Sequence, residues 1–81
     1  FAFFSELRMK FCGVSVSIFN YERQTDEELD IIDGDVLYIL LKDESGWWSA
    51  QNKRTKLVGL VPQNYLNEVS FFFYYWLLII I

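Results

Sequence analysis

The residues of this chain that are best suited to chemistry are aromatic side chains that lie near one another in the sequence. Trp47 and Trp48 are adjacent, Pro62 is the only proline, and Tyr65 follows it closely. Tryptophan and tyrosine each combine a large apolar face with one polar group, which suits a surface that is partly dry and partly hydrated. Side chains of this kind indicate non-covalent binding.

Acidic residues are concentrated upstream of the tryptophans. Seven of the fourteen residues in the range 22–35 are Asp or Glu, and Arg23 is the only base among them. Each surface ion pair contributes only about 0–1 kcal/mol, but together the charges steer a cationic partner. The net charge of −4 argues against nucleic acid as a partner, because phosphate binding needs a basic face.

Catalysis and metal binding have few candidate residues. The chain has no histidine, and Cys12 is its only cysteine, so neither an internal disulfide nor a zinc pair can form. No nucleophile, base and orienting group stand at a recognisable spacing. We therefore expect no enzyme, no metal and no cofactor. The lone thiol fits a reducing, cytoplasmic compartment, and we expect a monomer.

The elements that must position the aromatic residues are short strands separated by turns. Gly34 and Asp35 form one turn signal, and Pro62 ends a strand because it lacks an amide proton. The expected strands are Val14–Phe19, Val36–Leu41, Trp47–Gln51, Leu57–Val61 and a last short one within Asn64–Val69. Five short strands in fewer than sixty residues predict an all-β fold, a small and strongly bent barrel.

Strand alternation also predicts which side chains face inward. Trp47 and Trp48 must point to opposite faces of their strand. The apolar residues expected in the core are Leu29, Ile31, Val36, Leu37, Ile39, Ala50, Val61 and Leu66.

Five motifs, in order, resemble those of Src-homology 3 (SH3) domains. They are Ser17–Tyr21, the acidic Thr25–Leu29, Gly34-Asp35, Trp47-Trp48 and the closing Gly59–Tyr65. The resemblance covers Val14–Val69 and implies a five-stranded SH3 barrel, with residues 1–13 as a flanking segment. The stretches Leu37–Leu41 and Val58–Pro62 are also similar to the first SH3 domain of the fungal endocytic scaffolds of cortical actin patches.

The resemblance implies binding of proline-rich PxxP peptides, flanked by Arg or Lys, in the polyproline II conformation. It implies an adaptor role in signalling, in the cytoskeleton or in endocytosis. By position, the peptide-binding residues are Phe19, Tyr21, Glu28, Trp47, Pro62, Asn64 and Tyr65. Rim acids that can assist are Asp26, Glu27, Asp43 and Glu44. Trp47 Nε1–H, the Tyr65 hydroxyl and the Asn64 amide are the expected donors to ligand carbonyls.

Several positions depart from the family pattern. Phe19 stands in place of a tyrosine and keeps only its ring. Lys56 stands where many members have glycine, so a positive φ there would be strained. Ser15 and Ser17 occupy inward positions, where each hydroxyl needs a partner.

Residues 70–81 form an apolar tail with several interpretations. Phe71–Ile81 is eleven apolar residues, which as a helix rise about 16 Å, less than the about 30 Å of a bilayer core. A truncated membrane span, an aggregation-prone strand and translated non-coding sequence all remain open. One rival function is a membrane-anchored fragment in which this tail is functional. The other is an SH3-like module that uses its aromatic residues as a cage for another ligand.

Overall fold

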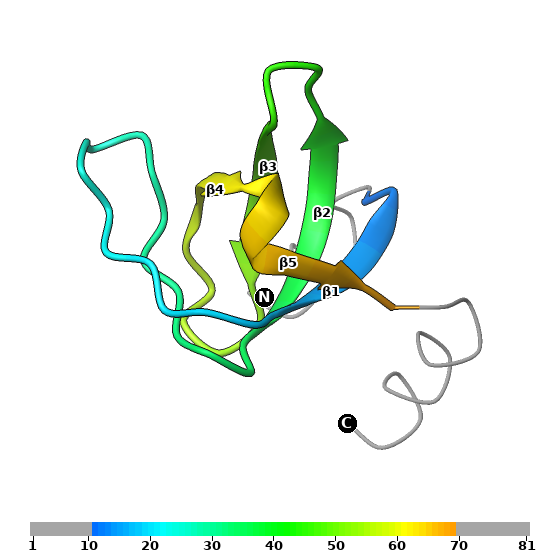
Figure 1. Ribbon diagram of the computed structural model, residues 1–81, viewed down its shortest axis with the longest axis horizontal. Helices are drawn as coiled ribbons and strands as arrows, with labels where there is room; N and C mark the ends of the chain where they lie inside the picture. The colour runs from blue at the N-terminus through cyan, green and yellow to red at the C-terminus, as the bar shows by residue number, and fades with distance from the viewer. Residues whose placement is uncertain (1–10, 70–81) are drawn as a thin grey trace, which may run out of the picture.

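The computed structural model describes residues 11–69, which contain five strands and one 3-10 turn (Figure 1). The elements are β1 Gly13–Ser17, β2 Val36–Lys42, β3 Trp47–Asn52, β4 Val58–Pro62, η1 Gln63–Tyr65 and β5 Leu66–Glu68. The strands pair antiparallel in the order β4-β3-β2-β1-β5. This arrangement confirms the all-β, five-stranded fold. A long loop joins β1 to β2 and extends from the sheet beside β4 (Figure 1).

The core follows the alternation of the strands, with two differences from expectation. Its buried residues are Leu29, Ile31, Leu37, Ile39, Trp48, Ala50 and Val61, with Tyr21, Tyr65 and Leu66 packed against them. Val36 was expected in the core but is only half-buried, because Leu37 takes the inward position of β2. Trp48 was not expected there and is 7% exposed. Its neighbour Trp47 is half-buried, as opposite faces require.

The two residues just before β1 also contact β2. The Cys12 amide donates to the Ile39 carbonyl at 2.7 Å, and the Phe11 ring lies 5.0 Å from the Tyr38 ring. The pairing with β2 therefore continues ahead of Val14.

The apolar tail Phe71–Ile81 lies outside the described residues. Within 11–69, no helix is long and apolar enough to cross a membrane.

A buried carboxylate organises the base of the barrel. The residue Asp35 is 5% exposed, and its carboxylate accepts two hydrogen bonds from the Arg54 guanidinium, at 2.8 and 3.0 Å. It also accepts the Asn52 side-chain amide at 2.8 Å and the Ile32 backbone amide at 2.9 Å. The Arg54 hydrogen bonds lower the pKa of Asp35 to about 2, against the opposing effect of burial.

The two inward serines of β1 differ in how their hydroxyls are satisfied. Ser17 donates to the Ile32 carbonyl and accepts the Asp35 amide at 3.0 Å. Ser15 is equally buried, but its hydroxyl has no hydrogen-bond partner within residues 11–69. An unsatisfied buried hydroxyl costs about 1–3 kcal/mol, so only Ser17 contributes to the fold through its side chain.

Lys56 adopts the left-handed backbone conformation, with φ of 68°. This confirms the expected strain at a position that glycine would occupy without cost. The local geometry is held by its amide, which donates to the Asn52 carbonyl at 2.8 Å, and by its carbonyl, which accepts the Gln51 side-chain amide at 3.2 Å.

We expect acid to destabilise the fold chiefly through Asp35. Its pKa is about 2 in the fold and 3.8 ordinarily, so its contribution is full above about pH 4 and disappears as the pH falls toward 2. The shift corresponds to roughly 2 kcal/mol. Urea unfolding followed by tryptophan fluorescence between pH 7 and pH 2 measures it. Asp35→Asn should lose about that much at pH 7 and show a flatter acid limb.

The matched control is Asp33→Asn, because Asp33 is an exposed acid in the same turn. This variant should keep the stability and the acid limb of the parent protein. Equal pH profiles for Asp35→Asn and the parent would show that the buried carboxylate does not carry the acid sensitivity.

Candidate functional site

Four aromatic rings meet in a continuous row on one surface. Phe19 contacts Tyr65 at 5.4 Å between ring centroids, Tyr65 contacts Tyr21 at 5.6 Å, and Tyr21 contacts Trp47 at 5.9 Å. Each pair is edge-to-face, the arrangement that the ring quadrupoles favour. We call these four residues the aromatic row. They come from three separate segments, so the row exists only in the folded barrel.

Backbone hydrogen bonds position the rings of the row. Tyr21 and Ile31 exchange amide–carbonyl bonds of 2.9 and 3.0 Å across the long loop. The Ile18 amide donates to the Tyr65 carbonyl at 2.9 Å, which ties the start of the loop to η1. Trp47 is the first residue of β3 and pairs with Pro62 in the register of β4. The row is thus fixed by the sheet and by the loop that crosses it.

The expected site residues differ in how exposed they are to solvent. Phe19 is 54% exposed, and Asn64 is exposed on η1. Pro62 is buried beside Trp47, so it supports that ring instead of presenting an open face of its own. The indole N–H of Trp47 has no hydrogen-bond partner within residues 11–69. It can therefore serve as a donor to a bound molecule.

Glu28 lies beside Tyr21, one of the two inner rings of the row. Its Oε1 accepts the Tyr21 hydroxyl and the Gln24 backbone amide, the latter at 2.9 Å. The Tyr21 hydrogen bond, more than the Gln24 amide, lowers the pKa of Glu28. The same bond raises the pKa of Tyr21 to about 12. Around neutral pH the pair is therefore an ionised carboxylate and a protonated phenol.

An acid in a loop that also carries Arg23 can instead form an ion pair with that base. Within the described part of the chain Glu28 has no ion pair, and its main side-chain partner is Tyr21, with a smaller contribution from the Thr25 hydroxyl. Tyr21 and Glu28 are seven positions apart in an irregular loop, where no period signals a contact.

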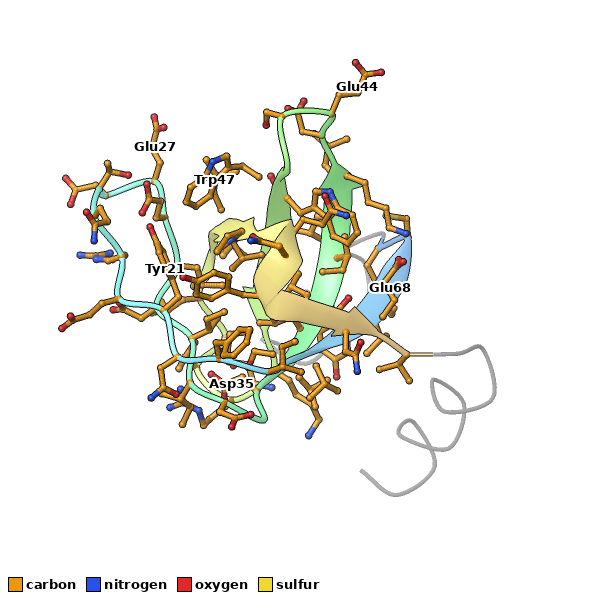
Figure 2. The ribbon with its side chains drawn as sticks, viewed as in Figure 1. Tyr21, Glu27, Asp35, Glu44, Trp47 and Glu68 are labelled. Carbon is orange, nitrogen blue, oxygen red and sulfur yellow. The ribbon has the colours of Figure 1, made fainter. Side chains whose placement is uncertain are left out.

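The four rim acids lie on two loops on either side of Trp47. Asp26 and Glu27 are exposed in the long loop, and Asp43 and Glu44 are exposed between β2 and β3. Figure 2 shows Trp47 between the loop that carries Glu27 and the loop that carries Glu44. Hydrogen bonds from Ser45 lower the pKa of Asp43. The aromatic surface is therefore flanked by negative charge.

The long loop approaches β4 so closely that Gly59 has no room for a side chain. The Leu29 amide donates to the Leu60 carbonyl, and the Leu60 amide to the Glu27 carbonyl, both at 2.9 Å. A Cβ at Gly59 would lie 3.0 Å from the Glu27 carbonyl oxygen and 3.1 Å from Leu29 Cβ. The sequence marks Gly59 only as part of the closing motif. The close approach of the loop explains why this position is a glycine.

Comparisons with known proteins agree with this geometry. The SH3 domain family model matches residues 16–63. The actin cytoskeleton-regulatory complex protein sla1 of Sclerotinia sclerotiorum is 38% identical over 68 residues, which is 76% of this chain and 6% of that protein. This confirms the similarity to a fungal actin scaffold. Proline-serine-threonine phosphatase-interacting protein 1 of Mus musculus is 36% identical over 53 residues, which is 65% of this chain and 12% of that protein.

Solved structures show the same fold. The C-terminal SH3 domain of myosin IB from Entamoeba histolytica, bound to the EhFP10(GEF) peptide, matches with a TM-score of 0.68 and 34% identity, covering 76% of this chain and 100% of that one. The SH3 domain of yeast NBP2 matches with a TM-score of 0.67 and 29% identity, covering 73% of this chain and all of the other. By contrast, this chain spans only 4% to 24% of the curated relatives' lengths.

We expect Gly59→Ala to displace the long loop, because the new Cβ meets backbone atoms that cannot move aside. It should destabilise the domain by about 1–3 kcal/mol, as overpacking does, and speed amide exchange at Leu29 and Leu60. Hydrogen exchange by NMR measures both effects. Gly13→Ala is the control, because its Cβ would have no atom within 4 Å. Unchanged exchange in Gly59→Ala would contradict the close approach.

Proposed function

Because this chain belongs to the SH3 domain family, we propose that its aromatic row binds proline-rich segments of other proteins, of the PxxP type with an adjacent Arg or Lys. The observation that carries the proposal is the row itself, three edge-to-face contacts in series, with Glu28 hydrogen-bonded to the inner ring of Tyr21. The SH3 family is a non-catalytic interaction module. The bound peptide in the myosin IB structure supports the same use of the fold.

The physical fit lies in the shape of the ligand. A polyproline II helix has three residues per turn and no internal hydrogen bonds, so it presents flat prolyl rings and open carbonyls. Its rigidity limits the conformational entropy lost on binding. We assign the grooves between the rings of the row to prolines. Trp47 Nε1–H, the Tyr65 hydroxyl and the Asn64 amide are the donors to its carbonyls, and Pro62 supports Trp47 from below.

The charge of the site fits the basic residue of the ligand. We assign the direct contact to Glu28, whose lowered pKa keeps it ionised. The exposed rim acids Asp26, Glu27, Asp43 and Glu44 then act mainly on the approach of the peptide, through their combined field.

The relatives of this chain support a proposal for the role of the whole protein. They include actin cytoskeleton-regulatory proteins of two fungi and myosins of Dictyostelium discoideum and Aspergillus oryzae. We therefore propose a cytoplasmic adaptor connected with the actin cytoskeleton and endocytosis. An aromatic cage for another ligand is less favoured, because the rings form an open row.

A PxxP peptide with a flanking Arg should bind with a Kd on the order of 1–100 μM, about −5 to −8 kcal/mol. Trp47→Ala should weaken binding more than about tenfold, because interface tryptophans are often energetic hot spots. Isothermal titration calorimetry measures the affinity, and circular dichroism checks the fold. Leu41→Ala is the control, since Leu41 is exposed on β2 outside the row. Loss of folding in Trp47→Ala would assign that residue to the core.

Glu28→Lys should weaken an Arg-containing peptide more than the same peptide with norleucine in place of Arg. The reason is that only the charged peptide loses an attraction and gains a repulsion. The parent protein's affinity for the Arg peptide should also fall with added salt, because exposed charges are screened. Equal losses for the charged and neutral peptides would remove Glu28 from the proposed contact.

A further inference from the structure

A second line of residues crosses the sheet beside Trp47. In the register of the strands, Leu41 of β2 pairs with Ser49 of β3, and Ser49 pairs with Leu60 of β4. Leu60 is in turn bridged to Glu28 of the long loop. Residues that pair directly across strands place their side chains on the same face of a sheet. These four residues therefore follow one another across the sheet, and we call them the cross-strand line.

The cross-strand line lies on the outer face of the barrel, the face that also carries Trp47. Trp48 and Ala50 of β3 are buried in the core, so Trp47 and Ser49 point the opposite way. Trp47 is two residues from Ser49 along the strand, a distance of about 7 Å. At its other end the line begins with Glu28, which is hydrogen-bonded to the aromatic row. The line and the row are therefore continuous with each other.

Two leucines give the cross-strand line an apolar character. Leu41 is 59% exposed, and Leu60 is half-buried. Ser49 between them is also half-buried and has a much smaller side chain, so an incoming group can approach β3 between the two leucines. Covering this surface removes apolar area from water, which favours binding. A single exposed leucine needs no explanation, but here the exposed leucine extends a surface that already has a proposed ligand.

The charges at both ends of the line limit what can cover it. Glu27 and Glu28 lie at the long-loop end, and the exposed Asp43 and Glu44 follow Leu41 in the chain. Like charges brought together across an interface are costly, so an acidic partner would be rejected. The fitting occupant is an apolar residue in a basic segment. The proposed peptide already brings Arg or Lys to Glu28, so its own continuation meets both requirements.

We propose that the cross-strand line binds an apolar residue of the ligand that lies about three positions beyond the Arg or Lys, on the side away from the PxxP core. Neighbouring strands are about 4.8 Å apart, which places Ser49 about 10 Å from Glu28, and an extended chain advances about 3.3 Å per residue. The inference rests on the proposed peptide-binding function and adds a second specificity position to it.

The test compares three peptides that share one PxxP core and its flanking Arg. The short peptide ends at the Arg, and the two longer peptides continue for three residues and end in Leu or Ser. The Leu peptide should bind about three- to tenfold more tightly than the Ser peptide, because only Leu covers apolar surface. The Ser peptide should match the short one. Isothermal titration calorimetry measures the three affinities, with the Arg on whichever side of the core gives the tighter short peptide.

Leu41→Ala should remove the advantage of the Leu peptide. It should leave the short peptide unaffected, because that peptide ends before the cross-strand line. Leu57→Ala is the matched control, since Leu57 is 61% exposed but lies outside the line, just before β4. This variant should keep the full advantage. Equal affinities for the Leu and Ser peptides, or an advantage that survives in Leu41→Ala, would overturn the inference while peptide binding stands. If none of the three peptides binds, the proposed function itself fails.

Two further measurements separate the ligand from other occupants of the line. In NMR titrations, the Leu peptide should shift the amide signals of Leu41 and Ser49, and the Ser peptide should not. Shifts confined to the aromatic row with both peptides would overturn the inference. Sedimentation of the domain without peptide should give a monomer for the parent and for Leu41→Ala. Self-association of the parent that Leu41→Ala abolishes would assign the line to a second copy of the chain and would also overturn it.

Discussion

The long loop between β1 and β2 depends on the buried carboxylate of Asp35. That group binds Ile32 at the end of the loop, Asn52 at the end of β3 and Arg54 in the following turn. Isolated charges are costly to bury unless they are paired and hydrogen-bonded. The network therefore requires these segments to meet at one point. Phe19, Tyr21 and Glu28 all lie on this loop. The position of the aromatic row therefore depends on the Asp35 carboxylate, which fixes the loop where it joins β2.

Further along, the loop is held at two more levels. Tyr21 and Ile31 bond to each other across its width, and Leu29 bonds to Leu60 of β4 where Gly59 leaves space. A segment with so many backbone hydrogen bonds and a buried apolar side chain, Leu29, resists local opening. This explains how an irregular segment can present aromatic rings in a fixed row.

The sequence predicted the strands well, because they follow local patterns, whereas the aromatic residues of the row were assigned together only through the family resemblance. Alternation in 14–19 and the turn at Gly34 are visible without tertiary information. The inward assignment of Val36 was wrong, and the burial of Trp48 was missed. Both outcomes depend on which face of the strand packs against the core, and that is decided by tertiary packing. The Asp35–Arg54 and Tyr21–Glu28 contacts join residues whose spacing reflects no period, so only the folded chain brings them together. Sequence alone marked Glu28 as an acid of interest but not the residue that holds it.

The sheet's two outer strands bear on how another protein can attach. Along β4, the backbone of Glu27–Leu29 already occupies part of the edge through the Leu29–Leu60 and Leu60–Glu27 hydrogen bonds. At the other edge, β5 is only three residues long, and its Glu68 is ion-paired with Lys42. Short, covered and charged edges give little template for an incoming strand. The edges of this barrel are therefore poor sites for pairing with a strand of another molecule. A peptide ligand must gain its affinity from side-chain contacts, which suits a backbone that is not in the β conformation.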